Sequence, residues 1–148
     1  MERFPVKRSQ ARRDLNESSP TVPEKRRFVV LEHRNHDGVH WDLMIETEPN
    51  GLLRTWAIDQ EIIRDQVLTA RALPDHRRSY LDYEGPISGE RGEVKRWDEG
   101  TCLVLARDEA EVLLTFRGSQ LDGSVSLRRI VGEPDSGSSW LFRFGKLS

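Results

Sequence analysis

The chain has 148 residues, of which 36% are hydrophobic and 32% charged, and its formal net charge is −2. This length and balance predict one soluble globular domain with a core of its own. Apolar runs reach roughly four residues, too few to cross a membrane. The charge argues against a protein that coats nucleic acid without selectivity. The single cysteine, Cys102, excludes a disulfide framework and is expected to be a buried strand residue. We expect a cytoplasmic monomer.

Residues 1–27 form a basic segment that we expect to be a flexible arm. They hold eight Lys or Arg and four Asp or Glu, a net of +4, which leaves −6 on the remainder. Their prolines and their lack of hydrophobic periodicity indicate loose structure. Such arms often contact phosphate backbones, and they are also often only solvating, so both interpretations stay open. Residues 28–148 are the expected folded domain.

From residue 28 onward, short runs of strand composition alternate with turn sequences. The predicted strands are 28–33, 40–46, 52–58, 93–97, 102–106, 112–117, 124–130 and 140–144, whereas 62–72 fits either a strand or a short helix. About eight strands at this spacing predict an all-β domain. We expect a single compact antiparallel β-barrel, closed or nearly closed.

Three of the four histidines lie within residues 33–40 and are followed by an aspartate. A turn at Asp37-Gly38 would join strands 28–33 and 40–46 into a hairpin that places His33 opposite His40. His40 and Asp42 then share a face of the strand. Two imidazoles and one carboxylate suit a divalent transition metal with open coordination positions. Ordinary surface residues are the alternative, and His36 is expected to be a solvated turn residue.

Arg54 is the one charged residue on an otherwise apolar strand face. It alternates in step with Trp56 and Ile58, and an unpaired charge in such a place costs free energy. Its guanidinium therefore either extends to water or meets a carboxylate or a ligand phosphate.

A series of motifs occurs along residues 28–141. They read FVVLEH at 28–33, HWDL at 40–43, LRTWA at 53–57, DH at 75–76, DYEG at 82–85, WDEGT at 97–101, FRG at 116–118, LDG at 121–123 and WL at 140–141. In this order they resemble the 3′-phosphoesterase domain of bacterial ATP-dependent DNA ligase D and its stand-alone relatives. The resemblance implies a compact β-barrel that uses manganese to remove a phosphate or a terminal ribonucleotide from DNA 3′ ends, leaving a 3′-OH.

The same resemblance implies roles for individual residues. The implied metal ligands are His33, His40 and Asp42, with Mn²⁺ as the expected ion and Co²⁺ or Zn²⁺ as alternatives. The implied catalytic residues that contact or position the phosphate are His76, Tyr80 and Arg54, the last at the family's lysine position. Fainter matches at the N-terminal side give Arg13, Asp14 and Glu24 as substrate-binding residues. Arg77, beside His76, is a further candidate for contact with the substrate backbone.

Met44 departs from the family pattern, because an arginine that grips phosphate is expected at this position. Arginine makes charge-assisted contacts to phosphate, which methionine lacks, and losing one such contact costs about two or three orders of magnitude in rate. Arg54, Arg34 and Arg77 are candidates for compensation. The alternative function is therefore a catalytically impaired relative that binds DNA ends or a repair partner such as a DNA ligase or polymerase.

A non-haem iron site is a third hypothesis. It would take its ligands from His40, Asp42 and His76, but it leaves His33 unexplained. We therefore favour the phosphoesterase interpretation.

Overall fold

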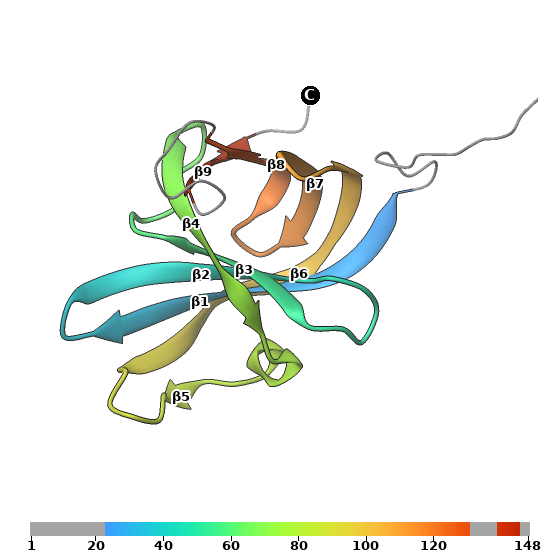
Figure 1. Ribbon diagram of the computed structural model, residues 1–148. Coiled ribbons are helices and arrows are strands. Elements are labelled where there is room, and N and C mark those ends of the chain that lie inside the picture. Colours follow the sequence, from blue (N-terminus) through green and yellow to red (C-terminus); the bar gives the residue numbers. More distant parts are fainter. Residues whose placement is uncertain (1–22, 131–138, 146–148) are drawn as a thin grey trace, which may run out of the picture.

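The computed structural model describes residues 23–130 and 139–145, which form an all-β fold (Figure 1). The strands are β1 (Glu24–Asn35), β2 (Gly38–Glu46), β3 (Leu53–Ile58), β4 (Val67–His76), β5 (Gly85–Pro86), β6 (Glu93–Arg107), β7 (Glu111–Gly118), β8 (Asp122–Arg129) and β9 (Ser139–Gly145). One short 3₁₀ helix, η1 (Arg78–Leu81), precedes β5. No described residue belongs to a helix long and apolar enough to cross a membrane.

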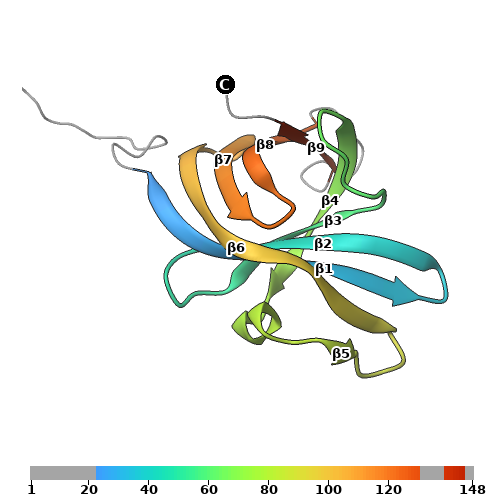
Figure 2. The same ribbon diagram turned by 180° about the vertical axis from the view of Figure 1, so that it is seen from behind.

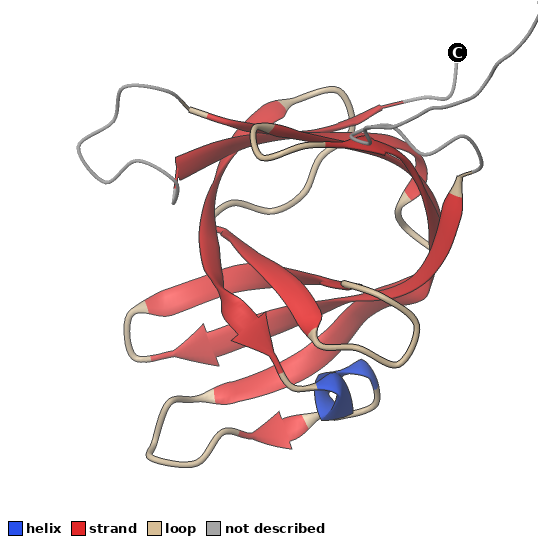
Figure 3. Ribbon diagram, turned by 45° about the vertical axis from the view of Figure 1, so that its right-hand side comes forward, coloured by secondary structure: helices blue, strands red, loops and turns tan. Residues whose placement is uncertain are grey.

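The strands close into an antiparallel barrel. Hydrogen bonding follows the order β1-β2-β3-β4-β9-β8-β7-β6, and β6 pairs back with β1 to complete the ring (Figure 3). The two-residue strand β5 is the ninth strand of the sheet and pairs with Glu93 and Val94 at the beginning of β6. The predicted all-β barrel of about eight strands is confirmed.

The course of β6 corrects the prediction of two separate strands at 93–97 and 102–106. Asp98 and Gly100 look like turn residues in the sequence, yet both lie within one strand. Asp98 is buried and accepts backbone hydrogen bonds from the loop after β7. Gly100 is needed because a Cβ there would lie 2.2 Å from the carbonyl oxygen of Arg117. These two residues therefore serve close packing rather than a turn. Cys102, farther along β6, is buried as expected, and burial raises the pKa of its thiol to about 12.

Two other strand boundaries differ from the sequence prediction. Residues 62–72 fitted either a strand or a short helix, and the structure has a strand there, because β4 begins at Val67. β1 begins at Glu24, so part of the expected arm belongs to the barrel and pairs with β6. The alternating pattern of residues 24–27 is too short and too polar for the sequence alone to indicate a strand, and only the pairing with β6 reveals it.

Two hydrophobic clusters lie on opposite faces of the same wall. Trp41, Leu43 and Ile45 of β2 point into the barrel, where the main core packs around the Trp56 and Trp140 rings. The second cluster lies on the outer face and consists of Val29, Leu31, Met44, Leu53, Leu81 and Val94. Strand alternation explains this division, because successive side chains face opposite sides of the wall.

The crossover from β4 to β6, residues 77–92, covers the outer cluster. η1 and β5 lie on one side of the barrel in both opposite views (Figures 1 and 2). Leu81 of η1 is fully buried against the wall, and Ile87 packs at its edge. The crossover is also tied by polar contacts, such as the hydrogen bond of 2.6 Å from the Arg96 amide to Glu84 Oε2. The barrel therefore carries a small covered surface on its outside.

Candidate metal centre

The β1–β2 hairpin brings two imidazoles together, with their ring planes tilted by 59°. His33 and His40 are direct partners in the antiparallel ladder, and their ring centroids are 4.6 Å apart. The hairpin turn consists of His36 and Asp37, followed by Gly38 at a positive φ of 125°. His36 is exposed in this turn, as expected. The strand pairing predicted from the sequence is confirmed.

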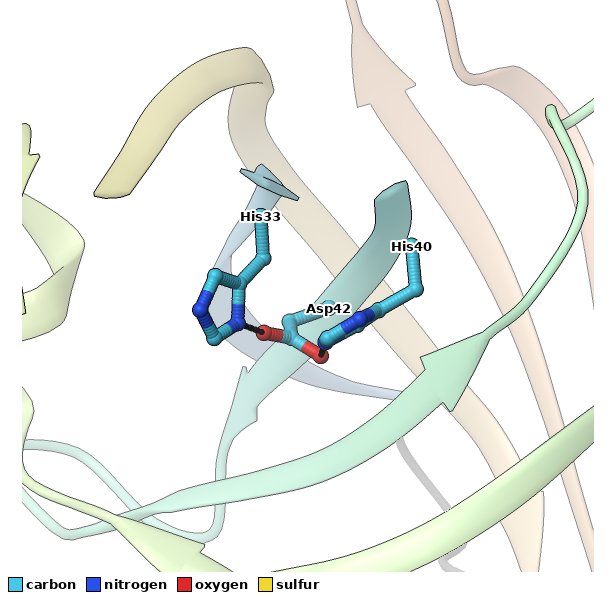
Figure 4. A group of neighbouring side chains, drawn as sticks. All are labelled: His33, His40 and Asp42. Atoms are coloured by element: carbon cyan, nitrogen blue, oxygen red, sulfur yellow. Dashed lines mark ion pairs between the residues drawn. The ribbon is translucent and has the colours of Figure 1, made fainter. Parts of the chain in front are cut away.

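Asp42 completes the cluster from the same outer face of β2 (Figure 4). Its Oδ1 lies 3.1 Å from Nε2 of His40, and its Oδ2 lies 3.5 Å from Nδ1 of His33. One ligand atom from each of the three side chains lies within 4.8 Å of the others. Asp42 is only 4% exposed, whereas both histidines are half-buried. The sequence-predicted ligand set is therefore gathered at one point of the wall.

The charges in the cluster are coupled. Burial raises the pKa of the Asp42 carboxyl, but the contacts with His33 and His40 outweigh burial and hold that pKa below its ordinary value. The contact with Asp42 in turn raises the pKa of the His33 imidazole. Asp42 is thus an anion that favours a cation beside it, either a proton on His33 or a metal ion.

The hydrogen bonds around the cluster fit a metal ion. His33 Nε2 lies 2.7 Å from the carbonyl oxygen of Arg91, which can only accept, so Nε2 carries a hydrogen. In a neutral ring Nδ1 then presents its lone pair toward Asp42, the orientation that supporting hydrogen bonds give to metal-bound histidines. Oδ1 of Asp42 is buried and accepts no hydrogen bond from any described residue. A divalent transition metal would give a partner to both Nδ1 of His33 and Oδ1 of Asp42.

His76 and Tyr80 reach the same place from the crossover side. A cavity of about 80 Å³ is lined by His33, Asp42, His76 and Tyr80. The rings of His76 and Tyr80 meet edge to face with centroids 5.6 Å apart. His76 Nδ1 lies 2.9 Å from the Pro74 carbonyl oxygen, so it donates there and Nε2 is the free nitrogen. The structure thus brings both expected residues beside the candidate metal ligands.

Met44, a member of the outer hydrophobic cluster, lines this cavity too. Its side chain is 1% exposed. Position 44, where the resemblance led us to expect a phosphate-binding arginine, therefore faces the candidate site, and here it presents a thioether.

Arg54 is not brought to the cluster, which corrects its expected place there. Strand alternation puts it on the inner face of β3, where its guanidinium lies 4.6 Å from the ring centroid of Trp56 and 5.3 Å from that of Trp140. It lines a different cavity, together with Glu46 and Arg107. The charge is half-buried over these aromatic faces.

Glu24, the one N-terminal candidate within the described residues, is also not gathered there. Glu24 begins β1, at the opposite end of the strand from His33, and its carboxylate pairs with Arg26 and Arg107. Its expected place at the site is therefore also corrected, because β1 extends through residues taken for an arm. Arg13 and Asp14 lie outside the described residues. Arg77 lines a neighbouring cavity on the crossover.

Two arginines beside the cluster were missed from the sequence. Arg71 of β4 lies opposite Ala57, which lies opposite Asp42, so the three residues form one row across the outer face. The pKa of Arg71 is raised chiefly by Asp59, through hydrogen bonds of 3.0 and 3.3 Å, and the charge of Asp42 raises it further. Strand alternation would have found Arg71 had 62–72 been assigned as a strand. Arg91 acts through its backbone carbonyl, for which a sequence gives no signal.

The fold and this cluster together define a small β-barrel protein with a candidate divalent-metal centre on its outer wall. Residues 31–129 match the family model of the DNA ligase D 3′-phosphoesterase domain, a range covering more than half of the 148 residues. The chain belongs to this family. The matched range includes the three candidate ligands, His76 and Tyr80. No match was found among curated protein sequences.

Proposed function

We propose that this protein is a metal-dependent phosphoesterase that removes a 3′-phosphate or a 3′-terminal ribonucleotide from DNA and leaves a 3′-OH. The observation that carries the proposal is the cavity that His33 and Asp42, two members of the three-residue cluster with His40, share with His76 and Tyr80, in a chain of this family. Mn²⁺ is the proposed ion, with Co²⁺ or Zn²⁺ as alternatives, since two imidazoles and one carboxylate suit each of them.

The proposed roles follow from the positions of the side chains. His33, His40 and Asp42 would hold the metal, which when bound supplies a Lewis acid that neutralises charge developing on the phosphate. His76 keeps Nδ1 engaged with Pro74, so a protonated His76 would donate from Nε2 to the phosphate or to the departing 3′ oxygen. The Tyr80 hydroxyl would position the phosphate within the same cavity.

Positive charge for the reacting phosphate would come from Arg71 rather than from position 44. Arg71 shares a row of the sheet with Asp42. Arginine binds phosphate oxygens through charge-assisted and often paired hydrogen bonds.

A second function is favoured by one specific observation. Met44 faces the cavity with no charge to offer, so the protein would in that case bind DNA or RNA–DNA 3′ ends without turnover, alone or beside a DNA ligase or polymerase. The two functions share their ligand and differ in catalysis, so a turnover assay separates them.

The test is removal of the phosphate from a 3′-phosphate primer in the presence of Mn²⁺. We expect turnover by the wild type and a loss of at least about a hundredfold in His40→Ala, since a ligand is removed. His36→Ala is the matched control, because His36 is exposed in the hairpin turn and is not a member of the His33–His40–Asp42 cluster. Equal turnover in all three proteins would sink the proposal, and an inert wild type that still binds the primer would establish the second function.

A further inference from the structure

A second cavity adjoins the metal-side cavity on the crossover. It has a volume of about 320 Å³ and shares Tyr80, Ile87 and Arg91 with its neighbour. Its other lining residues include Arg77, Tyr83 and Ser88. Because they share three residues, the two cavities lie side by side. We call the second cavity the groove; the candidate metal ligands His33 and Asp42 lie beyond the residues that it shares with its neighbour. The size lies near the lower limit of small-ligand sites, roughly 300 Å³, which suits one nucleotide unit.

The charge of this groove is positive. Arg77 and Arg91 form no ion pair with any carboxylate within residues 23–130 and 139–145. Arg91 is oriented by its own loop, because its Nε donates to the Ser88 carbonyl over 2.8 Å and its Nη2 to Ser88 Oγ over 3.3 Å. Most other arginines of the barrel surface have a carboxylate partner, as Arg71 has Asp59 and Arg128 has Glu111. Two arginines without such a partner leave the groove ready for an anion.

The groove also offers an aromatic platform. Tyr80 and Tyr83 meet edge to face, with ring centroids 6.0 Å apart and planes at 87°. Tyr83 is 37% exposed, and its hydroxyl donates to the Pro86 carbonyl oxygen, which fixes the ring at the rim of the groove. A fixed, exposed ring beside arginines is the combination that binds an unpaired base together with its phosphate.

We infer that this groove binds the penultimate nucleotide of the strand, the one that precedes the terminal nucleotide at the reacting 3′ end. Its phosphate would lie against Arg77 and Arg91, and its base would contact the Tyr83 ring. The inference rests on the proposed function for the direction of the strand, since the candidate metal ligands mark where the 3′ end lies. Because a base in a duplex cannot reach the ring, the penultimate nucleotide must be unpaired when bound.

The experiment compares two substrates of the Mn²⁺-loaded full chain. One is a deoxynucleoside 3′-phosphate, which is too short to enter the groove, and the other is a trinucleotide that ends in a 3′-phosphate. For the wild type we expect kcat/KM on the trinucleotide to be roughly tenfold or more above that on the single nucleotide, the range of one stacked base. A trinucleotide with an abasic penultimate position should lose most of this preference.

The variants test the three residues that carry the inference. Tyr83→Leu, and Arg77→Gln combined with Arg91→Gln, should reduce the ratio of the two kcat/KM values toward one. Tyr83→Phe keeps the ring and should keep the ratio. Arg128→Gln is the charge control, because Arg128 lies on β8 and is 70% exposed in its pair with Glu111. A ratio that stays at the wild-type value in Tyr83→Leu and in the double arginine variant overturns the inference.

Failure of the proposed function is distinguishable from failure of this inference. If no substrate is turned over, fluorescence anisotropy of a labelled trinucleotide 3′-phosphate measures the groove by itself. Binding that weakens about tenfold in Tyr83→Leu but not in Arg128→Gln supports the groove without the enzyme activity. Binding that is equal in both variants overturns it. Thermal unfolding of each variant identifies a protein that has lost its fold, and Tyr83→Phe and the abasic substrate then still decide.

Discussion

Glu46, on the outer face of β2, forms an ion pair with Arg78, the first residue of η1. The other oxygen of the carboxylate accepts the backbone N–H of Arg27 over 2.6 Å, and Glu46 is buried. Burial raises the pKa of Glu46, but the bonds from Arg27 and Arg78 outweigh it and hold that pKa below its ordinary value. This contact fixes η1, and with it Tyr80, against the barrel wall.

The Glu46 contact predicts a pH-dependent contribution to stability. A carboxyl whose pKa is lowered by folding stabilises the fold above its unfolded pKa, and this contribution is lost as the pH falls through the lowered folded value. Glu46→Gln should therefore unfold at a lower temperature than the wild type at pH 7, and the difference should shrink in acid. Thermal unfolding across pH 3 to 7, roughly the window in which carboxyls titrate, measures this. Glu109→Gln, exposed after β6, is the control; a Glu46→Gln difference that is the same at every pH contradicts the account.

Asp98 is predicted to be a stability residue with no direct role in the site. Its two oxygens accept backbone N–H bonds from Ser119, Gln120 and Leu121 over 2.8, 3.1 and 2.7 Å. Asp98→Ala leaves three donors of the β7–β8 loop without a partner, at a cost of about 3 kcal/mol in the free energy of unfolding. Urea unfolding measures this cost.

Asp108→Ala is the matched control for that measurement. Asp108 also accepts backbone N–H bonds, from Ala110 and Glu111, but it is exposed and water can replace it. We expect its loss to cost clearly less. Equal losses in the two variants would show that burial of Asp98 is not the reason for its effect.

Met44→Arg is predicted to raise turnover about tenfold or more. The new guanidinium would enter the cavity beside His76 and supply a charge-assisted phosphate contact. Stability should fall, because Met44 is buried against Leu53 and Leu81. Steady-state rates on a 3′-phosphate primer decide, with Met44→Leu as the uncharged control. If turnover stays at the wild-type level while primer binding is intact, the missing arginine does not limit catalysis.

Arg71→Gln is predicted to lower kcat/KM on the same primer at least about tenfold, since it removes a positive charge from the row that contains Asp42. Arg143→Gln provides a close control. Arg143, on β9, pairs with Asp65, and its side chain is 50% exposed. The side chain of Arg71, which pairs with Asp59, is 52% exposed. A similar loss in both variants would point to general charge rather than to a contact with the substrate.

Local alternation was enough to predict the hairpin and the cluster of side chains that it gathers. The turn at residues 36–37 fixes the pairing of His33 with His40, and a period of two then places Asp42 on their face. The barrel followed from the number and spacing of strands. These features depend on neighbours in sequence, which is why the sequence revealed them.

Features that depend on distant neighbours were not predictable. Asp98 and Gly100 look like a turn until the β7–β8 loop and the Arg117 carbonyl are placed against them. The covered outer face appears only once η1 packs on the wall, so Met44 could be assigned to a face but not to a cavity. Arg54 lies on the apolar face that alternation predicts, but its packing over Trp140 of the distant strand β9 appears only in the folded barrel.

The most direct test of the central claim is release of phosphate from a 3′-phosphate oligonucleotide as Mn²⁺ is added to protein first freed of metal by a chelator. The account predicts no release without metal, release that rises and saturates with Mn²⁺, and loss of that response in Asp42→Asn, where the buried anion between the two imidazoles is removed. Full release in the presence of the chelator, or an unchanged response to Mn²⁺ in Asp42→Asn, would contradict it.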